Sequence, residues 1–146
     1  MRKVVCRSFA PLSELVVEEG PDLVAGPGQV VVDVEAAGAN FVDALLVQGL
    51  YQIKPPLPFT PGMEVAGVVR AVGAGVPGVA EGDRVLATAF MGGYASQVVV
   101  PASAVSAIPA GLSSGQAATL VQSYATMLFA LTRRTTVARC TSRSAT

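Results

Sequence analysis

The amino-acid sequence predicts a mainly β domain, a sandwich or a partly open barrel, with short helices and a helical C-terminal part. Short runs rich in valine are separated by turns that contain glycine or proline, and the chain holds 15 Gly and 10 Pro. Many short strands between such turns are typical of all-β domains. After residues 109–111 the apolar residues change from the strand period of two to helical spacing. The chain is therefore expected to be β first and helical afterwards.

The composition places the chain among folded proteins with one core. Hydrophobic residues make up 51% of the 146 residues and charged residues only 14%, against about 25% charged in ordinary soluble domains. Disordered chains show the opposite balance, and some apolar surface is expected to meet a partner or a further domain. No apolar run reaches the roughly 18 residues that span a bilayer, and the N-terminus lacks a secretory apolar segment. We therefore expect a cytoplasmic protein with no membrane partner.

Alternation and turn residues place the expected strands. The strands are predicted at residues 1–7, 14–18, 29–37, 65–72, 84–87, 94–100 and 104–108. Within 29–37, Val30 and Val32 face one way while Val31 and Asp33 face the other, which indicates a half-buried strand that Gly38 ends. Gly67 interrupts its strand, as happens at a barrel corner or where two backbones approach closely.

Helices are expected in two places. Residues 40–49 form a short helix in which Asn40 is the N-cap, Asp43 meets the free amides of the first turn, and Gly49 is the C-cap. Residues 55–58 carry three prolines and are expected to be an extended loop. Ser113 and Gln116 form a capping box ahead of a helix at 117–121, and 123–132 has apolar residues at helical spacing. Two helices in close succession are predicted.

The donor residues argue against a metal centre. The chain has no His and two isolated cysteines, Cys6 and Cys140, so neither a zinc site nor a His-based catalytic triad is expected. Cys6 lies in a predicted strand and is interpreted as a buried structural thiol. The net charge is zero, but residues 1–132 hold six basic and ten acidic residues while the last 14 hold four Arg. That basic tail lacks aromatic residues, so no nucleic-acid partner is predicted.

Several short motifs, taken in order, point to one family. They are Ala-Asn-Phe-Val-Asp at 39–43, Gly-Leu-Tyr at 49–51, Pro-Gly-Met-Glu-Val-Ala-Gly at 61–67, Gly-Asp-Arg-Val at 82–85 and Gly-Tyr-Ala at 93–95. From Met1 to about Val137 the chain resembles the zinc-independent quinone oxidoreductases of the medium-chain dehydrogenase/reductase superfamily. Met63 stands where the alcohol dehydrogenase branch has a zinc-binding His, and a thioether is a poor zinc ligand.

The resemblance implies a domain organisation. Residues 1–112 would be a GroES-like (alcohol dehydrogenase N-terminal-like) β-barrel, 113–137 a helical connector, and 138–146 an atypical tail in place of a Rossmann domain that binds NADPH. The tail has no Gly and no apolar run, which indicates out-of-frame coding or a truncation, with a genuine short form as the competing interpretation. Gly73, Gly75 and Gly78 match a dinucleotide pattern by letters, but Pro77 falls inside it and no helix follows, so a turn is expected.

The resemblance also nominates site residues. Asn40 would orient a nicotinamide, ribose or substrate carbonyl, although it also suits a helix cap and one Asn can do both. Tyr51 would line the quinone pocket, or alternatively cover the barrel as a loop aromatic. Thr126 would approach the nicotinamide, or bond the preceding helical turn. Asp43 is interpreted as a helix-start carboxylate in preference to a base, and Glu64 as a structural ion pair with Arg70 or Arg84.

The expected function follows from the family. The chain would be the substrate-side domain of an NADPH-dependent quinone or enone oxidoreductase that transfers hydride without zinc. Asn40 and Tyr51 are the catalytic candidates, and Asn40 and Thr126 the cofactor-binding ones. The chain alone is expected to be inactive and to bind no NADPH tightly. The alternative is a catalytically silent fragment or interaction module that exposes the barrel surface, with a homodimer or self-association through exposed helices.

Overall fold

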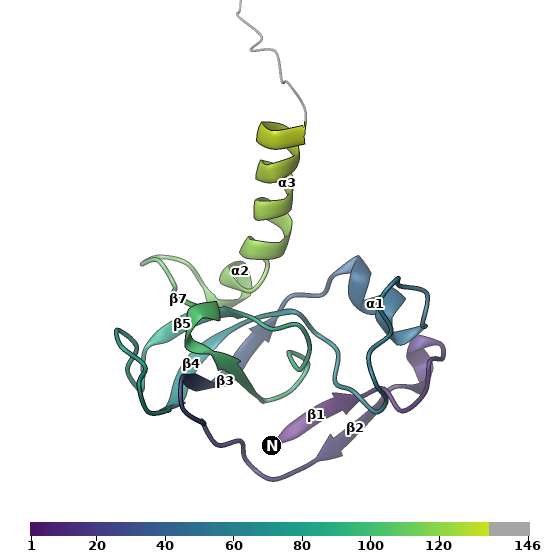
Figure 1. The fold of residues 1–146 in the computed structure, drawn as a ribbon, viewed down its shortest axis with the longest axis horizontal. Helices are drawn as coiled ribbons and strands as arrows, with labels where there is room; N and C mark the ends of the chain where they lie inside the picture. Colours follow the sequence, from purple (N-terminus) through teal and green to yellow (C-terminus); the bar gives the residue numbers. More distant parts are fainter. Residues whose placement is uncertain (135–146) are drawn as a thin grey trace, which may run out of the picture.

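A five-stranded antiparallel sheet forms the body of the molecule, in a computed structural model that describes residues 1–134. Its order is β6-β3-β4-β5-β7. The strands are β3 (Gln29–Ala37), β4 (Glu64–Val72), β5 (Arg84–Thr88), β6 (Gln97–Pro101) and β7 (Val105–Ala107). The sheet curls into a half-barrel, with its helical C-terminal part projecting away from it (Figure 1). The mainly β, partly open barrel prediction is confirmed.

A separate hairpin of β1 (Arg2–Val5) and β2 (Val16–Glu19) lies beside the open part of the half-barrel (Figure 1). Isolated bridges join Lys3 to Ala95 and Cys6 to Phe59, and these fasten the hairpin to the rest of the chain. Cys6 is a free, buried cysteine, as predicted, and burial raises the pKa of its thiol.

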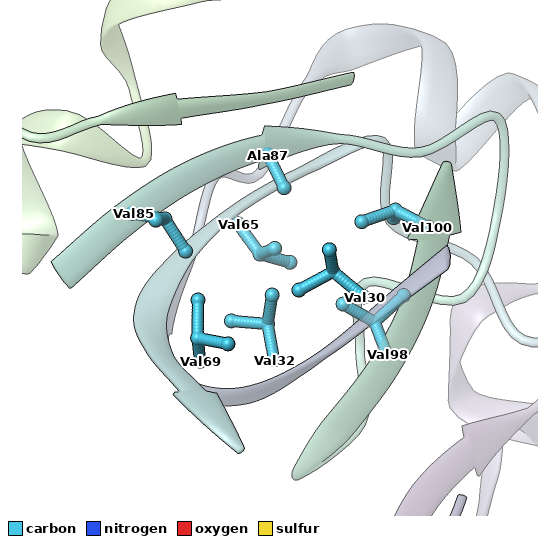
Figure 2. Close-up of a cluster of buried hydrophobic side chains, with 8 residues drawn as sticks. All are labelled: Val30, Val32, Val65, Val69, Val85, Ala87, Val98 and Val100. Atoms are coloured by element: carbon cyan, nitrogen blue, oxygen red, sulfur yellow. The ribbon is translucent and has the colours of Figure 1, made fainter. Parts of the chain in front are cut away.

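The concave side of the sheet holds the main apolar core (Figure 2). Eight buried side chains meet there: Val30, Val32, Val65, Val69, Val85, Ala87, Val98 and Val100. Val31 lies outside this cluster, as expected for the opposite face of β3, but it is 0% exposed. The strand is therefore covered on both faces at this point, in contrast to the half-buried strand that was predicted. The register of β3 against β4 shifts between Val31 and Val32 and again between Val34 and Ala36, and such irregularities bend a strand.

Gly67 lies where β3 and β4 approach each other. A Cβ at this position would overlap the carbonyl oxygen of Asp33 on the neighbouring strand. The closeness confirms the predicted approach of two backbones, and it explains why the row of side chains is interrupted on β4.

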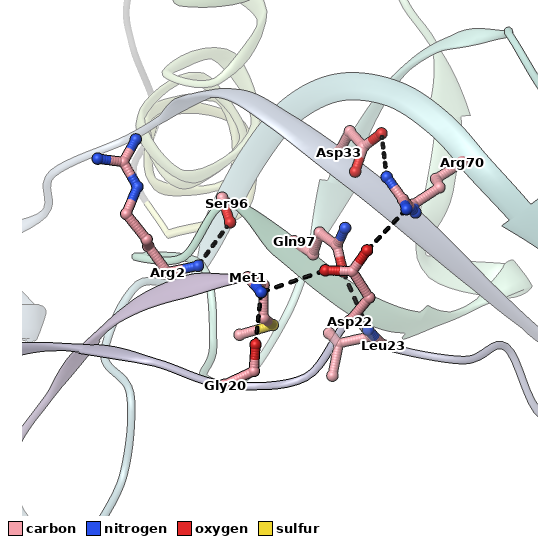
Figure 3. A network of polar contacts seen from close by, with 9 residues as sticks. All are labelled: Met1, Arg2, Gly20, Asp22, Leu23, Asp33, Arg70, Ser96 and Gln97. Carbon is pink, nitrogen blue, oxygen red and sulfur yellow. Dashed lines mark hydrogen bonds and ion pairs between the residues drawn. The ribbon is translucent and has the colours of Figure 1, made fainter.

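The polar contacts of Asp22 fasten the long connection between β2 and β3 to the sheet (Figure 3). Its carboxylate accepts from the Met1 amine at 3.1 Å and pairs with Arg70 at 2.7 Å. Arg70 also reaches Asp33 of β3 at 3.5 Å. One residue further along, the backbone N–H of Leu23 donates to the buried Gln97 side chain at 3.0 Å.

The helices begin close to where their caps predict. The predicted N-cap Asn40 precedes α1 (Phe41–Val47), and Gly49 follows with a positive φ of 68°. Short 3₁₀ turns occur at η1 (Leu12–Glu14) and η2 (Ala102–Ala104). The capping box of Ser113 and Gln116 opens α2 (Ser114–Ala117), so the helix expected at 117–121 starts and ends earlier.

The second C-terminal helical segment is longer than predicted. It combines α3 (Thr126–Phe129) with π-helical turns on both sides, η3 (Val121–Ala125) and η4 (Ala130–Arg134). We call this stretch, residues 121–134, the connector helix. No helix in the described part of the chain has the length and apolar character needed to cross a membrane. The predicted tail at 138–146 lies outside the described residues, and the boundary between 112 and 113 stays a prediction.

Candidate functional site

Three segments that are distant in the sequence converge at Gly38, where β3 ends. The Gly38 N–H donates to the backbone carbonyl of Glu64 at 3.0 Å, which joins it to the start of β4. A Cβ at Gly38 would overlap the carbonyl oxygen of Ala118 and would lie 2.6 Å from Glu64 Oε1. Only a residue without a side chain allows the start of β4 and the turn after α2 to meet here.

Asp43 anchors the first turn of α1 from inside. Its side chain is 4% exposed, and Oδ2 accepts from the backbone N–H of Asn40 at 2.8 Å, which is one bond of a capping box. The Tyr94 hydroxyl donates to the same oxygen at 2.8 Å. Oδ1 is buried without a hydrogen-bond partner within residues 1–134. Asp43 is thus the helix-start carboxylate that was predicted, with an additional tyrosine partner.

The environment of Tyr94 favours its neutral form. Desolvation by burial raises the pKa of Tyr94 well above its ordinary value, and the hydrogen bond to Asp43 and the charge of that residue raise it further. The hydroxyl therefore remains a donor to Asp43 across the physiological pH range. Sequence reasoning missed this contact, although Tyr94 belongs to the Gly-Tyr-Ala motif.

Glu64, like Asp43, accepts a hydrogen bond from Asn40, and it is even more deeply buried, at 2% exposed. Oε1 accepts from the Asn40 side-chain amide, Nδ2, at 3.3 Å, and Oε2 accepts from the backbone N–H of Gln122 at 2.9 Å. The predicted ion pair with Arg70 or Arg84 is wrong. Arg70 pairs with Asp22 and Asp33. Arg84 donates to the carbonyl of Leu112 at 3.0 Å.

The Pro-Gly motif explains why Tyr94 reaches this cluster. Gly62 has a φ of 100°, and the chain before β4 then runs against the segment before β6. Gly93 N donates to Gly62 O at 3.0 Å and Tyr94 N donates to Pro61 O at 2.9 Å. A Cβ at Gly62 would lie 2.6 Å from the Tyr94 nitrogen, so the two family motifs are packed directly against each other.

The other predicted site residues lie elsewhere. Tyr51 is half-buried and packs on the apolar cluster of Cys6, Leu46, Val47 and Phe59, together with Met63. Thr126 is exposed, one helical turn beyond Gln122 on the connector helix. Of the three candidates, only Asn40 belongs to the buried polar network. Sequence reasoning missed Gln122 because its backbone N–H, and not its side chain, donates to Glu64. Almost every residue type has such an N–H, so the amino acid at position 122 gives no indication of this bond.

The donor groups of the described residues include no cluster suited to a metal. No group of three or more His, Cys, Asp or Glu lies within reach of one ion in residues 1–134. Met63, which the resemblance places where the alcohol dehydrogenase branch has a zinc-binding His, packs against the apolar cluster beneath α1. The arrangement at Asn40 offers a neutral amide, held through Nδ2 by the buried Glu64 carboxylate, that can both donate and accept a hydrogen bond.

Two surface features lie near the network. An open groove of about 380 Å³ has Tyr94 in its wall together with Arg2, Lys3, Glu35 and Ser96, but neither Asn40, Tyr51 nor Thr126. The connector helix carries an apolar surface, which we call the helix stripe. Its members are Val121, Tyr124, Ala125, Met127, Leu128 and Leu131, together with Leu120, which directly precedes the connector helix. Asn40 lines neither the groove nor the helix stripe.

The curled sheet, the separate hairpin and the buried network at Gly38 define a GroES-like β-barrel domain. The family model described as the alcohol dehydrogenase GroES-like domain matches residues 26–110. The chain belongs to that family, which confirms the predicted resemblance.

Several known proteins similar to the chain carry oxidoreductase names. Quinone oxidoreductase-like protein 2 of Rattus norvegicus is 41% identical over 133 residues, covering 91% of this chain and 37% of the relative. The crystal structure of Escherichia coli quinone oxidoreductase complexed with NADPH matches with a TM-score of 0.88 at 29% identity, covering 94% of this chain and 42% of that one. A human synaptic vesicle membrane protein VAT-1 homolog-like protein gives a TM-score of 0.87 at 32% identity, covering 90% and 43%. The chain spans little more than a third of the length of the rat relative.

Proposed function

We propose that the chain forms the substrate-side domain of an NADPH-dependent quinone or enone oxidoreductase, in which hydride passes to the acceptor without zinc. The observation that carries the proposal is the Asn40 amide, held by buried Glu64 where the barrel meets the connector helix. The quinone oxidoreductase names of the relatives and the NADPH in the E. coli structure support it.

The residues present suit one end of the cofactor. Asn40 lies at the junction of barrel and connector helix, and Thr126 lies one helical turn beyond Gln122. These two side chains would hold the nicotinamide end through hydrogen bonds. NADPH, when bound, supplies the hydride. The Gly73–Gly75–Gly78 pattern lies in the turn between β4 and β5, where Gly75 and Gly78 have positive φ, so it opens no helix that could take a pyrophosphate. The rest of the cofactor would need chain beyond this domain.

Each remaining candidate has a role that its chemistry permits. Tyr51 would stack on or donate to the acceptor ring through its phenol. Asn40, which gives one Nδ2 hydrogen to Glu64, would donate the other to the acceptor carbonyl. The absence of His from the sequence and the packing of Met63 into the apolar cluster support a reaction without zinc. Polarisation of the acceptor then falls to hydrogen bonds.

The test is a hybrid enzyme. Residues 1–134 are fused to the part of E. coli quinone oxidoreductase that follows the matched region, and quinone-dependent loss of NADPH absorbance is measured. The hybrid should turn over, and Asn40→Ala should lower kcat/KM by about tenfold, as expected for loss of one hydrogen bond to the reacting groups. A folded hybrid that binds NADPH but reduces neither quinones nor enones would overturn the proposal.

The chain by itself should bind NADPH weakly, because Asn40 and Thr126 reach only the nicotinamide end. We expect a dissociation constant above about 1 mM, corresponding to only a few contacts. Calorimetric titration of the purified 146-residue chain measures it. Binding in the micromolar range would mean that a phosphate site exists within this chain.

The second candidate function is an interaction module without catalysis. The observation in its favour is the helix stripe, whose Tyr124, Met127 and Leu128 are each at least half exposed. An inactive hybrid, together with stable self-association of the chain, would favour this second function.

A further inference from the structure

Glu64 is a buried carboxylate whose partners are neutral. No ion pair found among the described residues includes it, although it is 2% exposed. Leaving a buried carboxylate without compensation is costly, so its hydrogen bonds must replace the water it has lost. Glu64 accepts two hydrogen bonds, and their donors, Asn40 and Gln122, lie 24 and 58 positions away in the sequence. A group that serves only the stability of β4 would not need partners in two other elements.

Each carboxylate oxygen has a different task. Oε1 holds the Asn40 side chain, and because an ionised carboxylate only accepts, it requires the amide to turn its Nδ2 inward. Oε2 holds the Gln122 N–H in the first turn of the connector helix, where backbone N–H groups have no helical partner and the helix dipole is positive. The Glu64 side chain thus links the orientation of the Asn40 amide to the position of the connector helix on the barrel.

Gly38 makes the coupling tight. The position that a Cβ would occupy there lies 2.6 Å from Glu64 Oε1 and overlaps the carbonyl of Ala118, four residues before Gln122. The Glu64 side chain is therefore enclosed between the end of β3 and the turn that leads into the connector helix. A shift of this turn would move Oε2, and with it the oxygen that holds Asn40.

We propose that Glu64 is a positioning residue, which fixes the Asn40 amide for its ligand only when the connector helix is seated on the barrel. The ligand part rests on the proposed function, whereas the coupling between Asn40 and Gln122 does not. The connector helix, which would lead toward a cofactor domain, thereby determines which atoms of the Asn40 amide face the ligand. Glu64 itself needs no contact with cofactor or acceptor.

The coupling is tested by NMR on the 146-residue chain with Glu64→Gln. A glutamine offers one acceptor oxygen in place of two, so it keeps either the Asn40 bond or the Gln122 bond and loses the other. We expect the Asn40 side-chain amide signals to shift and hydrogen exchange at Gln122 N–H or Asn40 Nδ2 to accelerate about tenfold, the effect of losing a bond to a charged acceptor. Glu81→Gln, the same change on an exposed turn, should alter neither signal.

A second variant keeps the test decisive if Glu64→Gln fails to fold. Asn40→Ala leaves the carboxylate intact but removes one of its partners, so exchange at the distant Gln122 N–H should still accelerate. Unchanged Gln122 exchange in Asn40→Ala, or unchanged Asn40 signals in Glu64→Gln, would overturn the proposal. A purely structural role predicts a lower unfolding temperature in Glu64→Gln, but unchanged exchange at Gln122 N–H in Asn40→Ala.

A double-mutant cycle in the hybrid enzyme tests whether Glu64 affects the reaction through Asn40. If Glu64 acts through Asn40, Glu64→Gln raises KM in the parent but has no further effect in Asn40→Ala. Equal effects in both backgrounds would refute the positioning role while leaving the proposed function intact. A hybrid without turnover would instead contradict the proposed function, and the NMR result would stand alone.

Discussion

Tyr94 and Asp43 share a hydrogen bond whose contribution to stability should depend on pH. Burial and the Asp43 carboxylate raise the pKa of Tyr94 in the folded state, whereas in the unfolded chain it titrates near its ordinary value of about 10. Its contribution is fully present below that value and is lost as the pH rises toward the folded pKa, because the unfolded state then binds fewer protons. The free energy of unfolding, from urea titrations, should fall more steeply above pH ~10 in the parent than in Tyr94→Phe. Tyr124→Phe, at an exposed tyrosine, should behave like the parent; equal slopes in all three chains would contradict the assignment.

Local rules predicted some residues of the site and could not predict others. Asn40 as N-cap and Asp43 in the first turn follow from residues three apart, so the sequence alone contains that signal. The error at Glu64 came from choosing a charged partner for a charged residue. Its actual partners are a neutral amide and a backbone N–H, and the latter would be the same for almost any residue at position 122.

At the scale of the elements, the pairing of β3 with β4 depends on Gly67. A Cβ there would overlap the Asp33 carbonyl, a backbone atom held in the sheet. Gly67→Ala should therefore destabilise the chain by about 3 kcal/mol, at the upper end of the cost of overpacking. Gly20→Ala is the matched control, because nothing lies within 4 Å of its would-be Cβ. Denaturant unfolding of both variants measures the difference, and a loss at Gly67 no larger than at Gly20 would mean that the strands can separate there without cost.

Strands were predictable where alternation is regular and less so at their ends. The prediction for 29–37 coincides with β3, while 94–100 began three residues before β6 (Gln97–Pro101). Tyr94 looks strand-like by residue type, but it belongs to the tight contact of Gly93 with Gly62. Contacts between distant glycines have no periodicity, so the sequence offers no means of seeing them.

At the scale of the whole molecule, the helix stripe should drive self-association of the isolated chain. Leu128 is 64% exposed on a helix that projects from the barrel (Figure 1), and burying such a side chain contributes about 1.5 to 3 kcal/mol. Sedimentation velocity over a concentration series should show dimers or larger species for the parent and mainly monomer for Leu128→Glu. Val24→Glu, at a site 84% exposed outside the helix, should associate like the parent. A parent that stays monomeric at high concentration would contradict this role of the stripe.

The low charge and high apolar content of the sequence indicated that some apolar surface would be exposed, but they did not indicate where it lies in the fold. The answer depends on the direction in which the connector helix leaves the barrel, because that direction leaves its apolar side chains exposed. Its apolar spacing from Tyr124 to Leu131 was visible in the sequence, whereas its direction away from the sheet was not.

The half-barrel is also open at its edges, and an unpaired strand edge can recruit further strands into fibres. Here both edges are poor templates. β7 is three residues long, and β6 ends at Pro101, which has no N–H to donate. Continuous addition of strands is therefore disfavoured at the two ends of this five-stranded sheet. Association of this chain should yield small soluble assemblies joined by side chains of the helix, and not cross-β aggregates.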